Sequence, residues 1–219
     1  GHVQNGWGLD DASYFNPVSK TWTRLPDMNN GRWYPSSTTL ANGDVLVASG
    51  SYNSTYTVNT VPQVWQINSG TWRNLTNANR HLPLYPSTFL APNGQVFFDT
   101  QNSYYLDTAN GGTWTLVARN VGFEGDNYRS SAMYDIGKVI RTGGGDPPTR
   151  TTEVIDLMPS TPAWRLSSSM ASPRRQHNLT ILPDGVLLAT GGSSLAGFNN
   201  RSGAVLAAEI WDPNTETLT

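Results

Sequence analysis

A unit of about fifty residues recurs along this 219-residue chain, and it constrains the fold more than any other feature. Four turn dipeptides mark the units, each between two short apolar runs: Asn42-Gly43, Asn93-Gly94, Ile136-Gly137 and Asp184-Gly185. A later tryptophan marks them again: Trp22, Trp72, Trp114 and Trp164. The turn glycines are 51, 43 and 48 residues apart, and the tryptophans are 50, 42 and 50 apart. Because two independent markers share one period, the chain is built from structural repeats.

Each repeat contains short apolar runs separated by turn residues, which predicts antiparallel strands rather than helices. Paired glycines follow the second run in several repeats, as at Gly143-Gly144 and Gly191-Gly192. Four short strands, a glycine pair and a late tryptophan at this period are typical of a kelch blade. We therefore predict an all-β fold, a kelch-type β-propeller of four-stranded antiparallel blades.

The repeat divides the chain into about four and a half blades of one domain. Residues 1–33 are expected to form an outer half-blade, residues 34–84, 85–127 and 128–176 complete blades, and residues 177–219 a nearly complete blade. The first hairpin of the half-blade is expected to precede Gly1. Exposed strand edges invite pairing, so we expect remaining propeller blades, a second copy or another chain to cover them.

The composition excludes several classes of binding partner and of enzyme. The chain has 14 Lys and Arg against 16 Asp and Glu, so it lacks the basic field that attracts nucleic acid or a membrane surface. Its longest apolar runs have strand length, which predicts no membrane span. It contains no cysteine and no motif of a serine hydrolase, an NTPase or a zinc protease. Four Asn-x-Ser/Thr sequences weakly favour secretion, with the signal peptide expected upstream of the chain.

Residues 34, 85, 128 and 177 recur just before the first strand of each blade, as Tyr, Tyr, Tyr and His. Their spacing of 51, 43 and 49 predicts one ring around the propeller axis. Arg32 precedes the first ring position, and two roles are open for it: hydrogen bonds to carbonyls at the mouth of the blade, which we favour, or substrate binding. For His177 we favour a hydrogen-bonded axial residue over one that orients substrate.

Four runs resemble the galactose oxidase and glyoxal oxidase family of copper radical oxidases, especially its bacterial members, in order and spacing. They are Gly31-Arg32-Trp33-Tyr34-Pro35-Ser36-Ser37-Thr38, Leu84-Tyr85-Pro86-Ser87-Thr88, Gly143-Gly144-Gly145-Asp146-Pro147-Pro148 and Pro173-Arg174-Arg175-Gln176-His177-Asn178. The resemblance runs through the whole chain. It implies a seven-bladed parent that oxidises primary alcohols, aldehydes or sugars with O2 and gives H2O2.

The resemblance also implies one copper ion near the axis, bound by two histidines and two tyrosines, one of them joined to a cysteine by a thioether. Tyr34 matches this cross-linked radical tyrosine. Its cysteine is expected before Gly1, and the other ligands after Thr219. Tyr52 matches the aromatic residue that stacks on the radical tyrosine, although the family usually has tryptophan there. We therefore expect copper in the parent, and neither copper nor activity in these 219 residues alone.

Two functions remain open at this point. The parent is either such an oxidase, with Tyr34 in its site, or a copper-free kelch module that binds glycans or a protein partner through its axial face. For Tyr34 itself, the structural alternative is a tyrosine whose hydroxyl caps a strand end. The substrate is not determined by the sequence, because the loops that select it vary.

Overall fold

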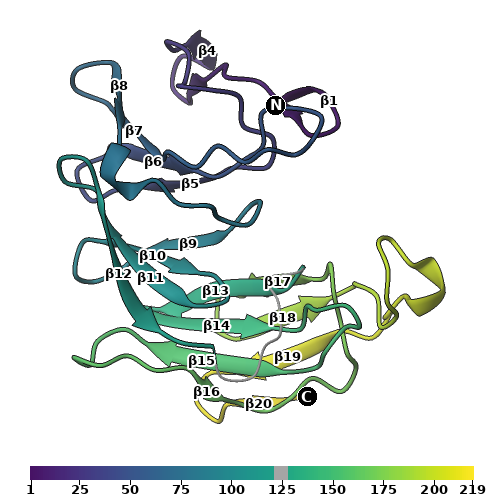
Figure 1. Ribbon diagram of the computed structural model, residues 1–219. Coiled ribbons are helices and arrows are strands. Elements are labelled where there is room, and N and C mark those ends of the chain that lie inside the picture. The colour runs from purple at the N-terminus through teal and green to yellow at the C-terminus, as the bar shows by residue number, and fades with distance from the viewer. Residues whose placement is uncertain (121–127) are drawn as a thin grey trace. The chain divides into compact units, whose positions relative to one another are not determined.

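A computed structural model describes residues 1–120 and 128–219. The described residues form two compact units: residues 1–100 with 104–115, and residues 101–103 with 116–219. Within these residues, regular structure consists of short strands and two single-turn 3-10 helices, η1 (Thr76–Ala78) and η2 (Arg201–Gly203). The prediction of an all-β fold is confirmed, and Figure 1 shows the strands in small separate sheets.

The first unit begins with two hairpins, each a sheet of two strands: β1 (His2–Gln4) with β2 (Trp7–Gly8), and β3 (Ser13–Asn16) with β4 (Thr21–Arg24). Two four-stranded antiparallel sheets follow. The strands of one, in spatial order, are β5 (Ser36–Thr39), β6 (Val45–Ala48), β7 (Gln63–Gln66) and β8 (Thr71–Asn74). Those of the other are β9 (Ser87–Leu90), β10 (Val96–Asp99), β11 (Ser103–Asp107) and β12 (Thr113–Ala118), of which the last two also reach into the second unit.

The second unit holds two more four-stranded sheets with the same sequential order. The strands of the first are β13 (Ser130–Asp135), β14 (Lys138–Thr142), β15 (Thr152–Asp156) and β16 (Arg165–Leu166). Those of the second are β17 (Asn178–Ile181), β18 (Leu187–Thr190), β19 (Glu209–Asp212) and β20 (Thr217–Leu218). Residues 177–219 thus contain all four strands of a sheet, where the sequence suggested a nearly complete one. The blade boundaries themselves stay a prediction.

The inner hairpins form where the sequence predicts them. Gly43, Gly94, Gly137 and Gly185 have φ values of 86°, 80°, 71° and 86°, which glycine adopts without steric cost. In the first of these turns the Asn42 side chain also accepts a hydrogen bond from the backbone N–H of Asp44, at 3.1 Å. Each turn therefore fixes the register of the two strands beside it.

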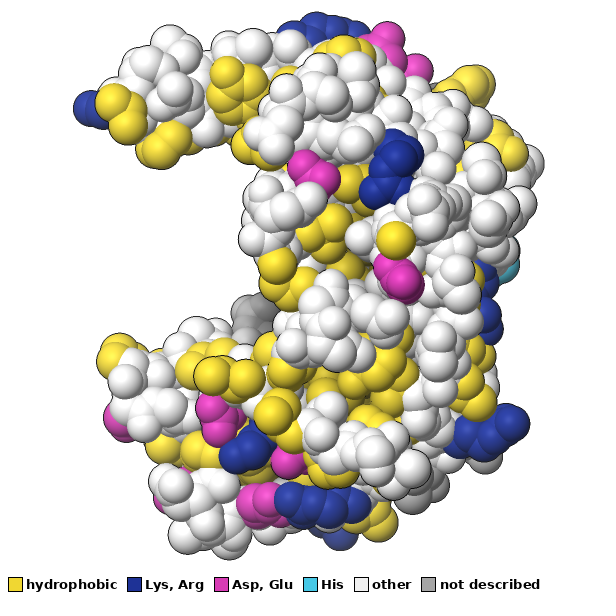
Figure 2. Space-filling model, turned by 90° about the vertical axis from the view of Figure 1, so that its left-hand side faces the viewer, with side chains coloured by type: hydrophobic (Ala, Val, Ile, Leu, Met, Phe, Trp, Pro, Cys, Tyr) yellow, Lys and Arg dark blue, Asp and Glu magenta, His cyan; other side chains and the backbone are white. Residues whose placement is uncertain are grey.

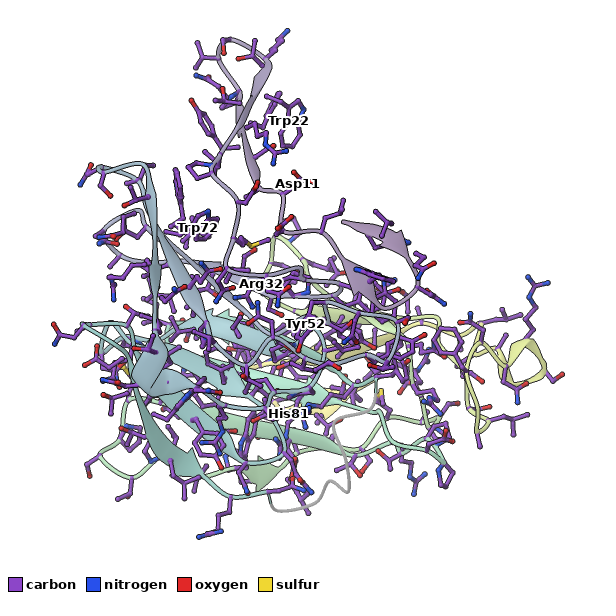
Figure 3. The ribbon with its side chains drawn as sticks, turned by 45° about the horizontal axis from the view of Figure 1, so that its top comes forward. Asp11, Trp22, Arg32, Tyr52, Trp72 and His81 are labelled. Atoms are coloured by element: carbon purple, nitrogen blue, oxygen red, sulfur yellow. The ribbon has the colours of Figure 1, made fainter. Side chains whose placement is uncertain are left out.

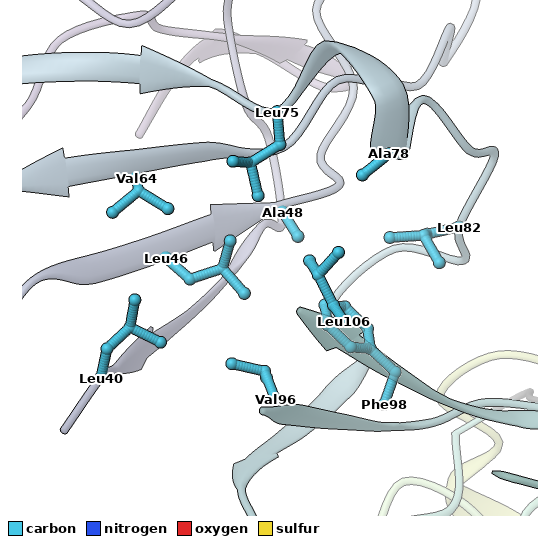
Figure 4. Packing of buried hydrophobic residues seen from close by; sticks show 10 residues of the cluster. All are labelled: Leu40, Leu46, Ala48, Val64, Leu75, Ala78, Leu82, Val96, Phe98 and Leu106. Carbon is cyan, nitrogen blue, oxygen red and sulfur yellow. The ribbon is translucent and has the colours of Figure 1, made fainter. Parts of the chain in front are cut away.

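In each unit, apolar side chains on facing strands build the core. In the first unit, Leu46 and Val64 pack with Val96, Phe98 and Leu106, all nearly inaccessible to solvent (Figure 4). In the second unit the core contains Ile140, Val154, Leu187 and Trp211. Burying such side chains stabilises the fold by about 2 kcal/mol each. The packing of sheet against sheet is what a propeller requires of its blades.

The surface agrees with the near-neutral composition. On the face drawn in Figure 2, Lys and Arg side chains are scattered among Asp and Glu, without a broad patch of one sign. Within residues 1–120 and 128–219, we find no helix with the length and apolar character of a membrane span.

Candidate functional site

Tyr34 lies in the turn that leads into β5, and its ring is held between two other aromatic rings. The ring of Trp33 stacks on it, with centroids 4.0 Å apart and planes inclined by 14°. The ring of Tyr85 meets it edge to face at 5.2 Å. Tyr34 nevertheless remains 49% exposed. The phenol is thus positioned by ring contacts while solvent or a ligand can still reach it.

The neighbouring rings extend this site into an aromatic cluster, by which we mean Trp33, Tyr34, Tyr56 and Tyr85. Tyr56 packs against Trp33 at 5.4 Å, and its ring also approaches the backbone of Gly6. The three tyrosines are each between 41% and 49% exposed. The rings come from three loops of the first unit, and because the tyrosines are nearly half exposed, the cluster forms a surface rather than a buried core.

The turn that holds Tyr34 recurs in each four-stranded sheet, two residues before the first strand. Tyr34, Tyr85 and Tyr128 have positive φ values of 59°, 39° and 59°, which are unusual for bulky residues. The fourth residue of this kind is Gln176, with φ of 55°. Backbone bonds join the turns in pairs, from Tyr85 N to Tyr34 O at 2.7 Å and from Gln176 N to Tyr128 O at 2.9 Å. Because this backbone conformation recurs before the first strand of each four-stranded sheet, we attribute it to the structure of the repeat and not to the function of one residue.

The structure therefore corrects the predicted ring of residues. Gln176, rather than His177, occupies the position equivalent to Tyr34. Strand pairing agrees, because the third residue after each of these positions pairs with the middle of the second strand: Ser37 with Val47, Thr88 with Phe98, Ser131 with Arg141 and Leu179 with Ala189. Counting from tryptophans could not separate two adjacent residues, and the histidine was the more conspicuous one.

His177 points into the second unit instead. Its Nε2 lies 2.8 Å from the hydroxyl oxygen of Thr142, and the side chain is nearly inaccessible to solvent. Burial, with a smaller contribution from the positive charge of Arg174, lowers the pKa of His177 to about 4. The imidazole is thus neutral at pH 7. The hydrogen bond to Thr142 is of the kind that we expected, whereas an axial role for His177 stays a prediction.

Arg32 is also buried, directly before the aromatic cluster. Its guanidinium donates to the carbonyl of Ser49 at 2.8 Å and to that of Val61 at 2.7 Å. The side-chain oxygens of Asn29 and Gln63 accept further bonds at 3.1 and 3.4 Å. Burial lowers the pKa of Arg32 to about 10. Arg32 thus makes the hydrogen bonds to carbonyls that we favoured from the sequence, and its role relative to substrate stays a prediction.

Tyr128 belongs to the second unit and has different neighbours from Tyr34. Its ring meets Phe198 at 5.7 Å, and the guanidinium of Arg175 lies 4.9 Å from the ring centre. Arg175 forms an ion pair with Asp146 at 2.5 Å, and this pairing lowers the pKa of the Asp146 carboxyl. Asp146 also accepts from the backbone N–H of Gly197 at 3.1 Å. These contacts hold two loops of the second unit together beside Tyr128.

Among the described residues Tyr52 makes no ring contact with Tyr34, and its stacking role stays a prediction. The ring stacked on Tyr34 is that of Trp33, the preceding residue. Tyr52 instead makes a backbone bridge to Trp7, and its N–H donates to the carbonyl of Thr57 at 3.0 Å. The adjacent pair Trp33-Tyr34 was visible in the sequence, but side-chain direction in a strained turn was not.

The described residues do not by themselves fit a copper ion. Copper in a site of nitrogen and oxygen ligands needs several donors that converge, and Tyr34 contributes one phenol among aromatic carbon atoms. The chain has three histidines. Two of them, His2 and His81, are exposed, and the third, His177, is committed to Thr142. The absence of cysteine also means that the chain alone cannot form a thioether.

Where residues 1–120 and 128–219 are concerned, one group of carboxylates lies close enough to hold a metal ion: Asp10, Asp11 and Asp27, with ligand atoms within 4.8 Å. All three are exposed. Arg24 already forms ion pairs with Asp11 and Asp27. Its guanidinium neutralises much of the charge that a cation would need, so this group is an ordinary surface ion pair.

Comparison with known proteins gives matches in sequence. No family model matches the chain. It is 29% identical over 246 residues to two galactose oxidases of Gibberella zeae, one from strain PH-1, and each match covers 99% of the chain and 36% of the galactose oxidase. It is 26% identical over 238 residues to a WSC domain-containing protein of Arthroderma benhamiae, with 93% of the chain and 25% of that protein covered. The chain thus spans between a quarter and about a third of these relatives.

Solved structures are similar in fold. A fungal alcohol oxidase of the AA5 family, in complex with copper, has a TM-score of 0.82 and 22% identity, covering 96% of the chain and 48% of the oxidase. YjhT has a TM-score of 0.68 and 14% identity, covering 95% of the chain and 82% of YjhT. The strands and these neighbours define a β-propeller fold. Within that class the chain is similar in sequence to galactose oxidases and in fold to an alcohol oxidase of the AA5 family, in the direction that its motifs indicated. The particular resemblance to bacterial members of the family stays a prediction.

Proposed function

We propose that the chain is part of a secreted copper radical oxidase that converts a primary alcohol or aldehyde, or a sugar with such a group, into its oxidised product while O2 is reduced to H2O2. Two electrons and two protons pass from substrate to O2, and an aldehyde reacts as its hydrate so that water supplies the second oxygen of the acid; the reaction then balances without a further reductant. In this proposal Tyr34 is the radical tyrosine and a copper ligand. The observation that carries it is the Tyr34 phenol, held by Trp33 and Tyr85 and still half exposed.

The remaining ligands must come from other polypeptide, since the chain's donors do not fit copper. When bound, copper would supply one-electron redox chemistry beside the phenol. The chain's own contribution is then to orient Tyr34 and to shield one face of its ring with Trp33. The 219 residues alone are expected to bind no copper at Tyr34 and to release no peroxide.

The test is peroxide release from the full-length protein that contains this chain, after copper loading, with glyoxal, galactose and glycerol as substrates. Tyr34→Phe keeps the ring and its stacking but removes the phenolic oxygen, so peroxide release should fall to background. Tyr14→Phe is the matched control, because Tyr14 is equally exposed and lies on β3, outside the aromatic cluster. Equal rates in the Tyr34→Phe variant and the unmodified protein would remove Tyr34 from the mechanism.

A second candidate, a copper-free module that binds glycans, is favoured by the aromatic cluster. Exposed rings on a surface with few charges stack on the apolar face of a sugar ring. If this is the function, oligosaccharides bind without copper, and Tyr56→Ala weakens binding while Tyr14→Ala does not. Isothermal titration with metal-free protein distinguishes the candidates, because the oxidase needs copper and the module does not.

A further inference from the structure

Asn30 is followed by Gly31 in the loop that leads from β4 to β5, and its side chain bonds to the backbone of that glycine. The Gly31 N–H donates to Oδ1 of Asn30 at 2.8 Å. Asparagine is thermolabile in proteins, and most so before glycine, because the glycine nitrogen can attack the side-chain amide. We propose that Asn30 is a site of spontaneous modification, at which the amide is lost and aspartate and isoaspartate form. The proposal is independent of copper.

The reaction balances with water alone. The Gly31 nitrogen bonds to Cγ of Asn30, the bond from Cγ to Nδ2 breaks, and Nδ2 leaves as ammonia with the proton of the Gly31 amide. Water then opens the resulting succinimide ring at one of its carbonyl groups. Opening at Cγ gives aspartate. Opening at the backbone carbonyl gives isoaspartate, in which the chain continues through the side chain.

Two other Asn-Gly pairs in the chain, Asn42-Gly43 and Asn93-Gly94, are held away from this reaction. The N–H of Gly43 donates to the Leu40 carbonyl at 2.9 Å, and that of Gly94 to the Ala91 carbonyl at 2.9 Å. Each asparagine side chain also accepts from the backbone N–H two residues further on, at 3.1 Å for Asn42 and 3.0 Å for Asn93. These bonds must break before the glycine nitrogen can reach the side-chain carbon.

The remaining two pairs, Asn5-Gly6 and Asn110-Gly111, are neither held nor oriented. Within the described residues, these two asparagine side chains have no hydrogen-bond partner, and neither do the N–H groups of the glycines that follow them. The attacking nitrogen is thus free, but no bond keeps the side-chain amide beside it. At Asn30 the bond from Gly31 holds the two reacting groups together, and such orientation accelerates a reaction within one chain.

The backbone around Gly31 is itself fixed by its contacts. A Cβ added to Gly31 would lie 2.1 Å from the Gly8 carbonyl oxygen, and the Arg32 N–H donates to the Leu9 carbonyl at 3.0 Å. Asn30, by contrast, is exposed. The glycine nitrogen is therefore held in place, while solvent reaches the amide that it attacks and can carry the ammonia away.

Isoaspartate at position 30 would disturb the support of Arg32, because it lengthens the chain before Gly31 by one carbon atom. Asn29, directly before it, accepts from the Arg32 guanidinium at 3.1 Å and donates its own N–H to the Gln63 side chain at 2.9 Å. Figure 3 shows Arg32 among the side chains of the first unit. We therefore expect the modified protein to be less stable, since a buried charge loses part of its hydrogen bonding.

The test is peptide mapping of the full-length protein that contains this chain, after incubation at mildly alkaline pH. Trypsin releases residues 25–32 as one peptide, since cleavage follows Arg24 and Arg32. Mass spectrometry detects the gain in mass when an amide becomes an acid, and fragmentation separates Asn29 from Asn30. Protein isoaspartyl methyltransferase, which methylates isoaspartate and leaves aspartate unchanged, distinguishes the two products.

In the folded protein, conversion at Asn30 should be roughly tenfold faster than at Asn42 or Asn93, because those side chains and glycines must first break their hydrogen bonds. Asn5 and Asn110 should fall between these limits. Conversion of Asn30 as slow as that of Asn42, or slower than that of Asn5 or Asn110, would overturn the proposal.

The same incubation in urea is the control for local sequence. Unfolding removes the hydrogen bonds that distinguish the Asn-Gly pairs, so their rates should converge. If Asn30 leads by the same factor in urea, the local sequence and not the fold sets its rate, and the proposal is wrong.

Asn30→Gln tests the consequence for stability, since its longer side chain keeps an amide but closes a ring far more slowly. Incubation should lower the urea midpoint of the unmodified protein and leave that of Asn30→Gln unchanged. Asn42→Gln is the matched control, and its midpoint should fall on incubation as that of the unmodified protein does. An equal fall in Asn30→Gln would assign the damage to another residue and contradict the proposal.

Discussion

The guanidinium of Arg32 lies 3.4 Å from the Gln63 side-chain oxygen in the first unit, at the place where Arg174 and Glu209 form a buried ion pair in the second. Both arginines also donate to the backbone at equivalent points, Arg32 to Ser49 and Val61, and Arg174 to Gly191 and Ala207. Gln63 and Glu209 both open the third strand of their sheets. One repeat thus keeps the carboxylate, and the other leaves a buried cation with neutral partners.

We expect Gln63→Glu to stabilise the chain by about 1–2 kcal/mol, because a charged acceptor then faces Arg32 while the existing bond from the Asn29 N–H is kept. Urea unfolding at pH 7 measures the change. Gln66→Glu, on the same strand but less buried, is the control for added charge and should change little. A lower free energy of unfolding for Gln63→Glu would show that the site cannot accommodate the pair.

The converse change belongs to the second unit. Glu209→Gln should lower the free energy of unfolding by about 3 kcal/mol, because it leaves the Arg174 charge buried without its carboxylate. Thermal and urea unfolding should both show the loss. A loss of only a few tenths would mean that the carbonyls around Arg174 suffice to hold its charge.

His177 should make stability depend on pH. Its pKa is about 4 in the folded chain and about 6.5 when unfolded, so between these values the unfolded state binds more protons. The contribution of the neutral imidazole is complete above pH 6.5 and is lost as the pH falls toward 4, by on the order of 3 kcal/mol.

Comparing unfolding at pH 7 and pH 4.5 isolates this effect. The loss of stability between the two should be smaller for His177→Gln than for the unmodified chain, with exposed His81→Gln as the control. Carboxyls with lowered pKa, such as Asp135 and Glu216, also lose stabilisation on acidification, but they do so equally in all three proteins. Parallel pH curves for His177→Gln and the unmodified chain would contradict the assignment.

Arg141 and Glu153 form a completely buried ion pair across β14 and β15, at 2.6 Å, with the Trp164 ring 3.9 Å from the guanidinium carbon. Arg141→Leu should lower the free energy of unfolding by about 3–5 kcal/mol, because the Glu153 carboxylate is then buried without its partner. The double variant Arg141→Leu/Glu153→Leu should recover much of that loss. A double-mutant cycle in urea checks this, and a double variant less stable than Arg141→Leu would refute the argument.

The stacking of Trp33 on Tyr34 makes a prediction about the proposed oxidase. In the full-length protein, Trp33→Leu should lower peroxide release more than Tyr52→Leu does, because Trp33 contacts the phenol ring. Copper content, measured in parallel, separates a loss of activity from a loss of metal. If Tyr52→Leu has the larger effect, the position indicated by the family resemblance is the relevant one.

The fold was predictable because each propeller repeat requires particular residues at fixed places in the sequence. Gly43 and Gly185 occupy turns that require positive φ, and the tryptophans mark the outer strands. The candidate site was harder to predict from the sequence. Whether Gln176 or His177 corresponds to Tyr34 depends on one residue of register, which spacing does not resolve but the strand pairing does.

The side-chain partners of the buried arginines could not be predicted from the sequence for a related reason. Gln63, Glu153 and Glu209 share a position only once each third strand is paired with its second. In the sheet of β13–β16 the arginine that pairs with the carboxylate is Arg141, which lies on the second strand, whereas Arg174 lies before the first strand of its sheet. The number of residues between arginine and carboxylate therefore differs from sheet to sheet. Likewise, the stacking of Trp33 on Tyr34 depends on the direction that a turn with positive φ gives to its side chains, which the sequence does not show.

The most direct test of the account is the chemical state of Tyr34 in the full-length protein after aerobic copper loading. Trypsin should release residues 33–73 as one peptide, since cleavage follows Arg32 and Arg73. We predict that mass spectrometry finds this peptide joined to a cysteine-containing peptide, with the combined mass lowered by two hydrogens, and that Tyr34→Phe abolishes the product. Recovery of residues 33–73 only at their linear mass, from protein that contains copper, would contradict the assignment of Tyr34 as the radical tyrosine.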